Sequence, residues 1–413
     1  MTSGNVLRLD VTGQDVHGEA RLLRAEGSAG LVELPGGVPA WAVADAATLR
    51  KLLTDPRVSK DPRAHWTALR EGRIGEDWPL LIWVSVRNMF TTYGADHRRL
   101  RTLVSKAFTP RQVEAMRPEI DQITTELLDR LAGAGAEQVD LREEFAYLLP
   151  VEVICRLFGV PADRRDAMRS VVDTIFDTTV TAEQAQANSL ELYELMRGLV
   201  AEKTANPGDD LTSALITARA EDATRLDADE LVDTLILMLT AGHETTVNLL
   251  DHAVTALLTH PAQLAAVRRG EHTWAEVIEE TLRWQAPVPY LPLRYAVEDI
   301  VLDDGTIIGK GEAILAAYAG AGRDPAEHGD TADEFDLSRA DKQHLAFGHG
   351  VHFCLGAPLA RLEAAIALPA LFARFPELRL AVDPAELATV PSFLSNGHTA
   401  IPALLGPADE PVT

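Results

Sequence analysis

The apolar positions of the chain follow a helical period over most of its length. In segments 127–131, 151–158 and 189–200, apolar residues recur at spacings of three and four, which places them on one face of a helix. Strand signals are confined to two regions: apolar runs flank a Pro-Gly-Gly turn in 31–43, and short apolar runs alternate with turn residues in 299–316. The pattern predicts a mainly α protein with a small β part.

The strongest helix signal lies between Leu226 and Pro261. Asp227 or Asp229 provides the N-cap and the proline ends the helix, so about 32 residues at about 1.5 Å each make a rod of roughly 48 Å. Its middle, 241–246, combines glycine and threonine, which are poor helix formers, with a glutamate that is costly to bury. A local conflict inside a strong element indicates a functional site.

The composition is typical of a globular protein and limits the classes of partner. The chain has 413 residues, of which 46% are hydrophobic and 24% charged, and 62 acidic against 38 basic side chains give a net charge of −24. This length exceeds the size at which one simple core stops growing, so it predicts two domains or one large domain with a smaller lobe. The acidic charge argues against binding to nucleic-acid phosphate or to an anionic membrane surface.

The cysteine content and the first residues predict a cytoplasmic protein. Two cysteines, Cys155 and Cys354, are too few for a disulfide framework and fit a reducing compartment. The opening residues show no basic segment followed by an apolar one, so we expect no secretory signal. The longest apolar runs, such as 235–239, are far below the roughly 20 residues that span a bilayer, so we expect no membrane anchor.

The segment with the most specific chemistry is FGHGVHFCLG, residues 347–356, which precedes a helical pattern. Its glycines permit a tight loop, and Cys354 stands just before a helix N-terminus, where the dipole and free N–H groups favour a thiolate. Such a thiolate suits a metal ligand or a nucleophile, the latter with His349 or His352 as its base. Cys155, in an apolar helical segment, is interpreted as a small buried hydrophobe.

Four motifs, in one order along the chain, resemble those of the cytochrome P450 family. The loop matches the spacing of the family's haem-binding loop at Phe347, Gly350, His352, Cys354 and Gly356. The other three are GADHRRLR at 94–101, which resembles a haem-contacting helix, AGHETT at 241–246, which resembles the oxygen-activating stretch, and 280–283, which resembles the Glu-x-x-Arg pair. The resemblance covers nearly the whole chain. It implies one P450 domain over 1–413, with a β-rich lobe around 28–45 and 295–318 and haem between the long central helix and the cysteine loop.

The resemblance also implies a cofactor and the residues around it. Haem b would be ligated by the thiolate of Cys354, whose electron density favours O–O cleavage. The implied haem-binding residues are His97, Arg101, Ala241, Arg294, Phe347, Gly348, His352, Cys354 and Gly356. Glu244 and Thr245 would form the catalytic pair that relays protons to oxygen. Glu280 and Arg283 would be a structural pair in a buried network.

Family position alone indicates which residues face the substrate. They are Met89, Phe90, Phe176, Thr179, Leu237, Thr240, Ala241, Val288, Pro289, Tyr290, Leu291 and Leu394. Nearly all are apolar, as expected for a bulky apolar substrate fixed by few polar contacts. Several segments resemble an actinobacterial subgroup that includes steroid hydroxylases and macrolide oxidases. We expect a steroid, and a macrolide, polyketide or other secondary metabolite is the alternative.

The resemblance implies a monooxygenase that takes O₂ and two electrons from outside, since the chain has no further flavin or iron–sulfur domain. We expect a ferredoxin and its reductase to supply them. Six basic residues and one acidic residue between 97 and 117 form a patch that we expect to dock an acidic ferredoxin, although a solvated helix face has equal weight. The basic residues are Arg98, Arg99, Arg101, Lys106, Arg111 and Arg117. A non-catalytic haem-thiolate sensor and a cysteine hydrolase remain as alternatives from other classes.

Overall fold

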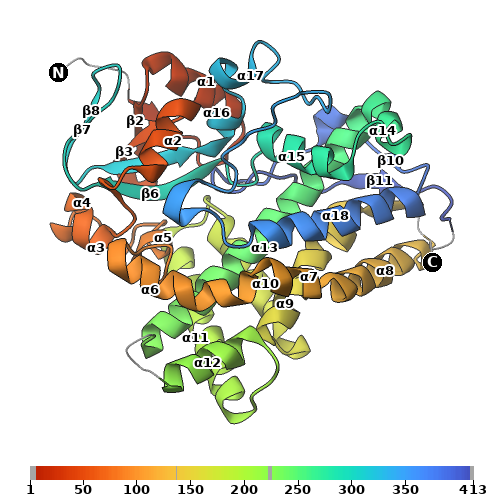
Figure 1. Ribbon diagram of the computed structural model, residues 1–413, viewed down its shortest axis with the longest axis horizontal. Coiled ribbons are helices and arrows are strands. Elements are labelled where there is room, and N and C mark those ends of the chain that lie inside the picture. The colour runs from red at the N-terminus through yellow and green to blue at the C-terminus, as the bar shows by residue number, and fades with distance from the viewer. Residues whose placement is uncertain (1–5, 136, 222–225, 410–413) are drawn as a thin grey trace.

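The computed structural model describes residues 6–135, 137–221 and 226–409, and most of them are helical (Figure 1). The strands of the main sheet gather at one end of the molecule, beside α1 (Val16–Glu26) and α2 (Ala46–Thr54). The predicted mainly α architecture with a small β part is confirmed. Within the described ranges, no helix has both the length and the apolar character needed to cross a membrane.

The main sheet has six strands in the order β1-β2-β3-β9-β6-β4. They are β1 (Leu7–Arg8), β2 (Gly30–Leu34), β3 (Val38–Val43), β9 (Ala313–Ala317), β6 (Tyr290–Ala296) and β4 (Val58–Ser59). The predicted strands beside the Pro-Gly-Gly turn are β2 and β3, which pair antiparallel. Because β3 pairs parallel with β9, the two regions with strand signals join one sheet. Strand β6 lies outside the predicted regions, since burial on both faces removes its polar–apolar alternation.

Two small sheets complete the β part. The first is the hairpin of β7 (Ile300–Val301) and β8 (Ile307–Ile308), which lies inside the region predicted to alternate strands and turns. The second joins β10 (Arg379–Leu380), β11 (Pro402–Leu404) and β5 (Gln138–Asp140), and both of its pairings are antiparallel.

The long central helix is α13 (Ala228–Thr259), which has 32 residues as the sequence predicts. Asp227, and not Asp229, is its N-cap: the Asp227 carboxylate accepts from the N–H of Glu230, and the Glu230 carboxylate accepts from the N–H of Asp227. Pro261 begins the next helix directly after the C-cap. Most side chains of α13 are buried, because helices cover it on several sides.

The other helices pack around α13 or flank the main sheet, and apolar side chains fill the space between them. The longer ones are α6 (Gly94–Ser105), α8 (Arg117–Gly133), α9 (Leu148–Phe158), α10 (Arg165–Phe176), α11 (Ala182–Ala205), α12 (Leu211–Glu221), α14 (Pro261–Arg268), α15 (Trp274–Trp284) and α18 (Ala357–Arg374). The short ones are α3 (Pro62–His65), α4 (Thr67–Arg70), α5 (Ile82–Ser85), α7 (Pro110–Ala115), α16 (Tyr318–Gly322) and α17 (Pro325–His328). Figure 1 shows α18 crossing in front of α13, and the two helices are in contact.

Candidate functional site

An apolar cavity lies between the middle of α13 and the loop that precedes α18. It encloses about 1280 Å³ of empty space, part of it open to solvent. Ala241 and Thr245 line it from α13, and Cys354 lines it from the loop. All of the predicted haem contacts except His97 and Arg294 line this cavity.

The cysteine loop is folded tightly by two glycines. Gly348 and Gly350 have φ of 69° and 73°, a region that side chains other than glycine rarely adopt. A Cβ on Gly350 would also lie 2.6 Å from the carbonyl oxygen of Leu53 at the end of α2. The loop is closed by the N–H of Cys354, which donates to the carbonyl of Phe347 at 2.8 Å. These contacts fix the direction of the cysteine side chain.

The thiol of Cys354 lies at the N-terminus of α18. Its desolvated position in the cavity wall raises the pKa of this thiol above the usual value, while hydrogen bonds from the N–H groups of Gly356 and Ala357 act in the opposite direction. N–H groups directed at the sulfur stabilise a thiolate once a cation binds it. The other cysteine, Cys155, is 1% exposed inside α9, and burial raises the pKa of its thiol to about 11. Cys354 is therefore the cysteine whose surroundings suit a metal.

Buried nitrogen donors without partners lie beside the cavity. Arg294 is 4% exposed, its Nε has no partner, and the described residues offer its guanidinium no ion pair. His97 is 3% exposed with an unpaired Nε2, and its ring lies 4.1 Å from that of His352. Burial and the charge of Arg101 lower the pKa of His97 to about 4, so its imidazole is neutral near pH 7. A buried, unpaired donor costs about 1–3 kcal/mol, so this cluster fits a bound anion.

The donor set therefore fits a haem. A sulfur ligand faces the cavity, the walls are largely apolar, and cationic donors at its edge match the two propionates of a haem. Arg101 of α6, which is distant in the sequence, contacts the cysteine loop: its Nη2 donates to the carbonyl of Phe353 at 2.7 Å. The loop and α6 are thereby held together at the cavity wall.

Two neighbouring residues of α13 face different cavities. Thr245 lines the apolar cavity, and its hydroxyl donates to the carbonyl of Ala241 at 2.8 Å. Glu244 instead lines a separate cavity with about 760 Å³ of empty space, whose walls include Arg142, Asp173 and Ser395. The two residues predicted to act as a pair thus lie on different faces of the helix.

The carboxylate of Glu244 is held on its side of the helix by two partners. Its Oε1 accepts from Ser395 Oγ at 2.7 Å and from Arg142 Nη2 at 3.1 Å. Burial raises the pKa of Glu244, and the charge of Arg142 opposes that effect. The sequence did not indicate Arg142 or Ser395, because both are far from Glu244 along the chain and neither lies in a motif.

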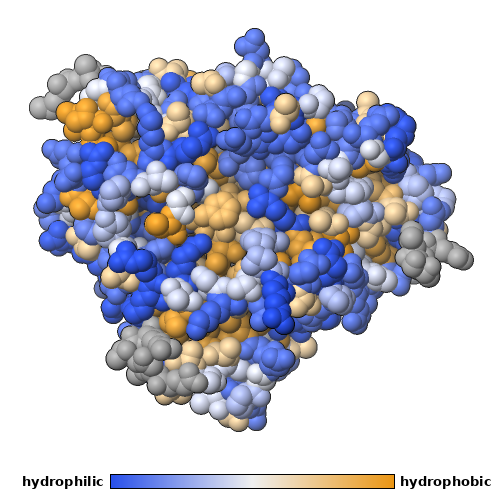
Figure 2. Space-filling model, viewed as in Figure 1, coloured by the Kyte–Doolittle hydropathy of each residue, from blue (hydrophilic) through white to orange (hydrophobic). Residues whose placement is uncertain are grey.

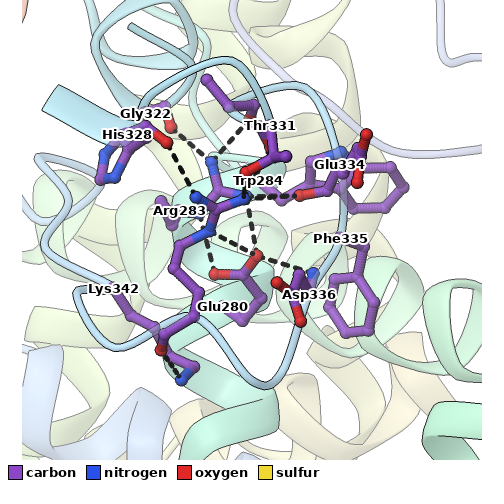
Figure 3. A network of polar contacts seen from close by, with 12 residues as sticks. Glu280, Arg283, Trp284, Gly322, His328, Thr331, Glu334, Phe335, Asp336 and Lys342 are labelled. Carbon is purple, nitrogen blue, oxygen red and sulfur yellow. Dashed lines mark hydrogen bonds and ion pairs between the residues drawn. The ribbon is translucent and has the colours of Figure 1, made fainter. Parts of the chain in front are cut away.

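Glu280 and Arg283 form a fully buried ion pair of 2.7 Å, and both side chains are 0% exposed. Arg283 also donates to the carbonyls of Gly322 and Glu334 (Figure 3). Glu280 accepts from the N–H of Asp336 at 2.9 Å. The pair joins α15 to the segment 322–336 and lies outside the cavity.

The residues predicted to face the substrate divide into two groups. Eight of them line the main cavity or a neighbouring apolar cavity: Met89, Phe90, Phe176, Leu237, Thr240, Ala241, Val288 and Leu291. Four lie away from both cavities. Thr179 donates to Asp177, and Tyr290 contacts Glu19. Pro289 and Leu394 are absent from the cavity walls, and Leu394 is packed in the core beside the sheet.

One aromatic residue of the neighbouring cavity is absent from the predicted set. Trp83 packs edge-on against Phe176, with ring centroids 5.4 Å apart, and against Phe90 at 6.5 Å. Polar residues of the same wall are bonded to the backbone: Asn88 Nδ2 donates to Asp233, and Thr240 donates to Ile236. This cavity therefore presents mainly aromatic and aliphatic surface.

Two basic residues of the predicted patch form ion pairs with nearby acidic residues. Arg99 pairs with Glu230 at 2.6 Å, and Arg117 pairs with Glu114 at 2.5 Å. In the described part of the chain, Arg98, Lys106 and Arg111 form no ion pair.

Figure 2, viewed as in Figure 1, shows apolar side chains in the middle of the face, surrounded by hydrophilic ones. Val351 and Phe353 of the cysteine loop are 67% and 39% exposed.

Comparison with known proteins gives relatives over nearly the full length. The sequence pattern of the family described as Cytochrome P450 matches residues 274–386. The chain is 49% identical over 399 residues to 2-hydroxy-5-methyl-1-naphthoate 7-hydroxylase of Streptomyces carzinostaticus, covering 96% of this chain and 97% of that protein. It is 41% identical to the cytochrome P450 monooxygenase PikC of Streptomyces venezuelae, covering 96% and 94%.

Solved structures share the fold as well. CYP154A1 of Streptomyces coelicolor A3(2) superposes with a TM-score of 0.93 at 56% identity, covering 97% of this chain and 100% of that one. A testosterone-bound CYP154C4 from Streptomyces sp. ATCC 11861 superposes with a TM-score of 0.94 at 46% identity, covering 98% and 99%. The chain belongs to the cytochrome P450 family, and it is a monooxygenase with a cysteine-ligated haem.

Proposed function

We propose that this chain binds haem b through Cys354 and inserts one atom of O₂ into a bulky apolar substrate, with steroids as the first class. The observation that carries the proposal is a largely apolar cavity bounded by Cys354 on the loop side and Thr245 on the α13 side. When bound, the haem supplies the iron that activates O₂, aided by electron density from the sulfur. His97, Arg101, Arg294 and His352 hold its propionates.

Within this proposal, Thr245 and Glu244 move protons. The hydroxyl of Thr245 donates to a backbone carbonyl, which leaves its oxygen able to accept a hydrogen bond from water in the apolar cavity. Glu244 exchanges protons with solvent in the polar cavity beside Arg142. Glu244 faces away from Thr245, so a proton can pass between them in one of two ways. Either the carboxyl group of Glu244 leaves Ser395 and Arg142 each time it delivers a proton, or a water bridges Glu244 and Thr245.

The substrate class rests on the walls of the neighbouring cavity. Its surface is aromatic and aliphatic around Trp83 and Phe176, which suits a rigid hydrocarbon skeleton. A testosterone-bound structure among the similar proteins supports steroids. The second candidate is an aromatic or macrolide polyketide, which the similarity to a naphthoate hydroxylase and to PikC supports.

The electrons come from a redox partner, since P450 relatives use redox partners, O₂ and hydrophobic substrates. We propose a ferredoxin with its reductase as the donor. Its docking face is the exposed part of the cysteine loop with the neighbouring basic side chains Lys106 and Arg111.

A visible titration tests the proposal. The reduced protein is first exposed to carbon monoxide, and a thiolate-type spectrum in the wild type but not in Cys354→Ala identifies the ligand. Testosterone, 2-hydroxy-5-methyl-1-naphthoate and a macrolide are then added to the ferric protein. We expect a low-spin to high-spin shift with testosterone. A shift with only one of the other two compounds selects that class instead.

Turnover separates the monooxygenase from a haem-thiolate sensor. With NADPH, ferredoxin and reductase, we expect a hydroxylated product in proportion to the NADPH consumed. A protein that shows the spin shift and forms no product with any donor would be a sensor.

A further inference from the structure

A lysine that the sequence did not single out is buried without an acidic partner. Lys60 directly follows β4 and is 2% exposed. Its ammonium donates to the carbonyl of Pro292 at 3.2 Å and lies 3.4 Å from the centroid of the Phe90 ring. The described residues give it no ion pair. A buried charge is costly unless an opposite charge is paired with it. The surroundings of Lys60 therefore favour a bound anion.

The nearest charged neighbour has the same sign. Strands β4 and β6 pair antiparallel with Ser59 opposite Tyr295, so the next position of the register sets Lys60 against Arg294. Arg294 is itself 4% exposed and has no ion pair in the described chain. Like charges opposite one another on neighbouring strands are destabilising. Two buried cations side by side therefore indicate one missing anion that both serve.

Other titratable groups around Lys60 do not supply that anion. The nearest acid in the sequence, Asp61, caps α3 by accepting from the N–H of Arg63. His65 contacts the hydroxyl of Ser59. The charges of Arg294 and Lys60 both act on His352, whose own pKa is lowered chiefly by burial. Every group that faces Lys60 is thus cationic, neutral or already bonded elsewhere.

Without an anion, the amine of Lys60 does not keep its proton readily. Burial is the larger cause of a pKa well below the usual value, and the charge of Arg294 adds to it. An anion near Arg294 opposes both effects, because an opposite charge favours the protonated amine. Binding of that anion and uptake of a proton from solvent at Nζ are then linked.

We propose that Lys60 is a further anchoring residue for the carboxylate held by Arg294, a haem propionate in the loaded protein. The inference rests on the proposed binding of haem at Cys354. A carboxylate of an acidic substrate shares the same chemistry, and Phe90, whose ring contacts Lys60, lines both apolar cavities. The propionate is the favoured source because His97, His352 and Arg294 gather at the same place.

Loss of haem from the holoprotein to excess apomyoglobin tests the role of Lys60. We expect Lys60→Met to lose haem about tenfold faster at pH 7, which is the effect of one hydrogen bond to a charged group. Lys60→Arg keeps the charge and restores slow loss. Lys310→Met, which removes an exposed lysine, is the matched control and leaves the rate unchanged.

The pH dependence gives the sign of the linkage. The protonated amine of Lys60 favours retention of haem. Its contribution to haem retention is therefore complete at low pH and is lost as the pH rises through the pKa of Lys60 in the loaded protein. Haem loss from the wild type accelerates over that range, whereas loss from Lys60→Met does not. Should Lys60→Met fail to fold, resonance Raman bending modes of the propionates in Lys60→Arg and the wild type report the same contact.

Three results overturn the inference. Equal haem retention by Lys60→Met and the wild type, or rapid haem loss from Lys60→Arg as well as from Lys60→Met, removes the charge of Lys60 from the cofactor site. Unchanged retention together with lost binding of 2-hydroxy-5-methyl-1-naphthoate assigns the carboxylate to substrate. The carbon monoxide spectrum of the wild type is recorded first, because absence of a thiolate signature there overturns the proposed function itself.

Discussion

At the scale of single residues, the direction of a side chain matters more than its position in the sequence. Glu244 and Thr245 are adjacent, yet one lies in a polar cavity beside Arg142 and the other faces the apolar cavity of Cys354. On a helix, neighbouring residues point about 100° apart, so an adjacent pair divides between two faces. We therefore expect changes at the two side chains to have separable effects on turnover.

Replacing Thr245 by alanine is expected to divert electrons into hydrogen peroxide. The variant loses the hydroxyl that is proposed to accept from water in the cavity, while the side chains proposed to hold the haem are unchanged. We expect unchanged haem content, product per NADPH reduced at least about tenfold, as expected for loss of a positioned proton donor, and peroxide in its place. Thr255→Ala is the matched control, since that hydroxyl also donates to its own helix but lines neither apolar cavity. Normal coupling in Thr245→Ala would show that proton delivery bypasses this residue.

A second residue-scale prediction concerns acid stability. Asp251 is fully buried, accepts from Arg142 at 2.8 Å and contacts His398. Although burial, the largest single effect, raises the pKa of Asp251, its partners bring it to about 2, below the usual 3.8. A lowered pKa contributes stability above pH 3.8 that is lost as the pH falls through about 2. The difference is worth about 2 kcal/mol.

Urea unfolding of Asp251→Asn between pH 2 and 7 measures this contribution. We expect the free energy of unfolding at pH 7 to fall by at least about 2 kcal/mol and its decline in acid to become shallower. Asp163→Asn, which changes an exposed carboxylate, serves as the control. If the free energy of unfolding of Asp251→Asn declines in acid as steeply as that of the wild type, other groups cause the loss of stability in acid.

At the scale of elements, the sequence predicts what is decided locally. The length of α13 follows from its apolar pattern, its N-cap and the proline after it, and the tight cysteine loop follows from its glycines. Contacts between distant segments carry no such pattern. Arg142 and Ser395 meet Glu244, and Lys60 meets Arg294, only because the fold brings separate elements together.

Helix α13 also shows why a residue can contradict local propensity. Gly242 is a poor helix former, but a Cβ there would lie 2.7 Å from Ile154 Cδ1 of α9. The glycine therefore permits the two helices to approach closely. Part of the conflict that marks this segment in the sequence is therefore due to packing and not to chemistry.

Gly242→Ala is expected to destabilise the protein despite the better helix propensity of alanine. Propensity favours alanine by about 1 kcal/mol, while forcing a methyl group into a packed interface costs about 1–3 kcal/mol. Ile154→Val removes the Cδ1 atom that the new methyl group meets. Thermal unfolding of both single variants and the double variant measures their coupling, and we expect the double variant to be more stable than the sum of the single changes predicts. Additive effects would contradict the packing explanation.

At the scale of the whole molecule, charge is unevenly distributed. The chain carries −24 overall, yet unpaired basic side chains lie in the region of α6 and α7, near the exposed part of the cysteine loop. An acidic partner is repelled by most of the surface and attracted at this face, which orients its approach. The proposed docking of a ferredoxin at this face therefore predicts that electron transfer depends on salt through a few residues.

Charge reversal of Lys106 and Arg111 tests this orientation. We expect the double change to glutamate to raise the apparent KM for ferredoxin about tenfold at low ionic strength, with the difference shrinking as salt is added. Reversal of Lys310 and Arg379, two exposed basic residues elsewhere, changes the net charge equally and is expected to have a small effect. Equal effects of the two double variants would mean that total charge, and not this face, governs docking.

The cavity of Glu244 and the apolar cavities give the molecule a wet compartment and a dry one, which α13 and the ring of Phe176 separate. A ligand that enters beside Trp83 and Phe90 displaces water only from the dry compartment. The carboxylate of Glu244 stays in contact with the wet one. Hydration of the acid then depends on the bound ligand only through Phe176, so we expect ligands that leave this ring in place to meet the same supply of protons.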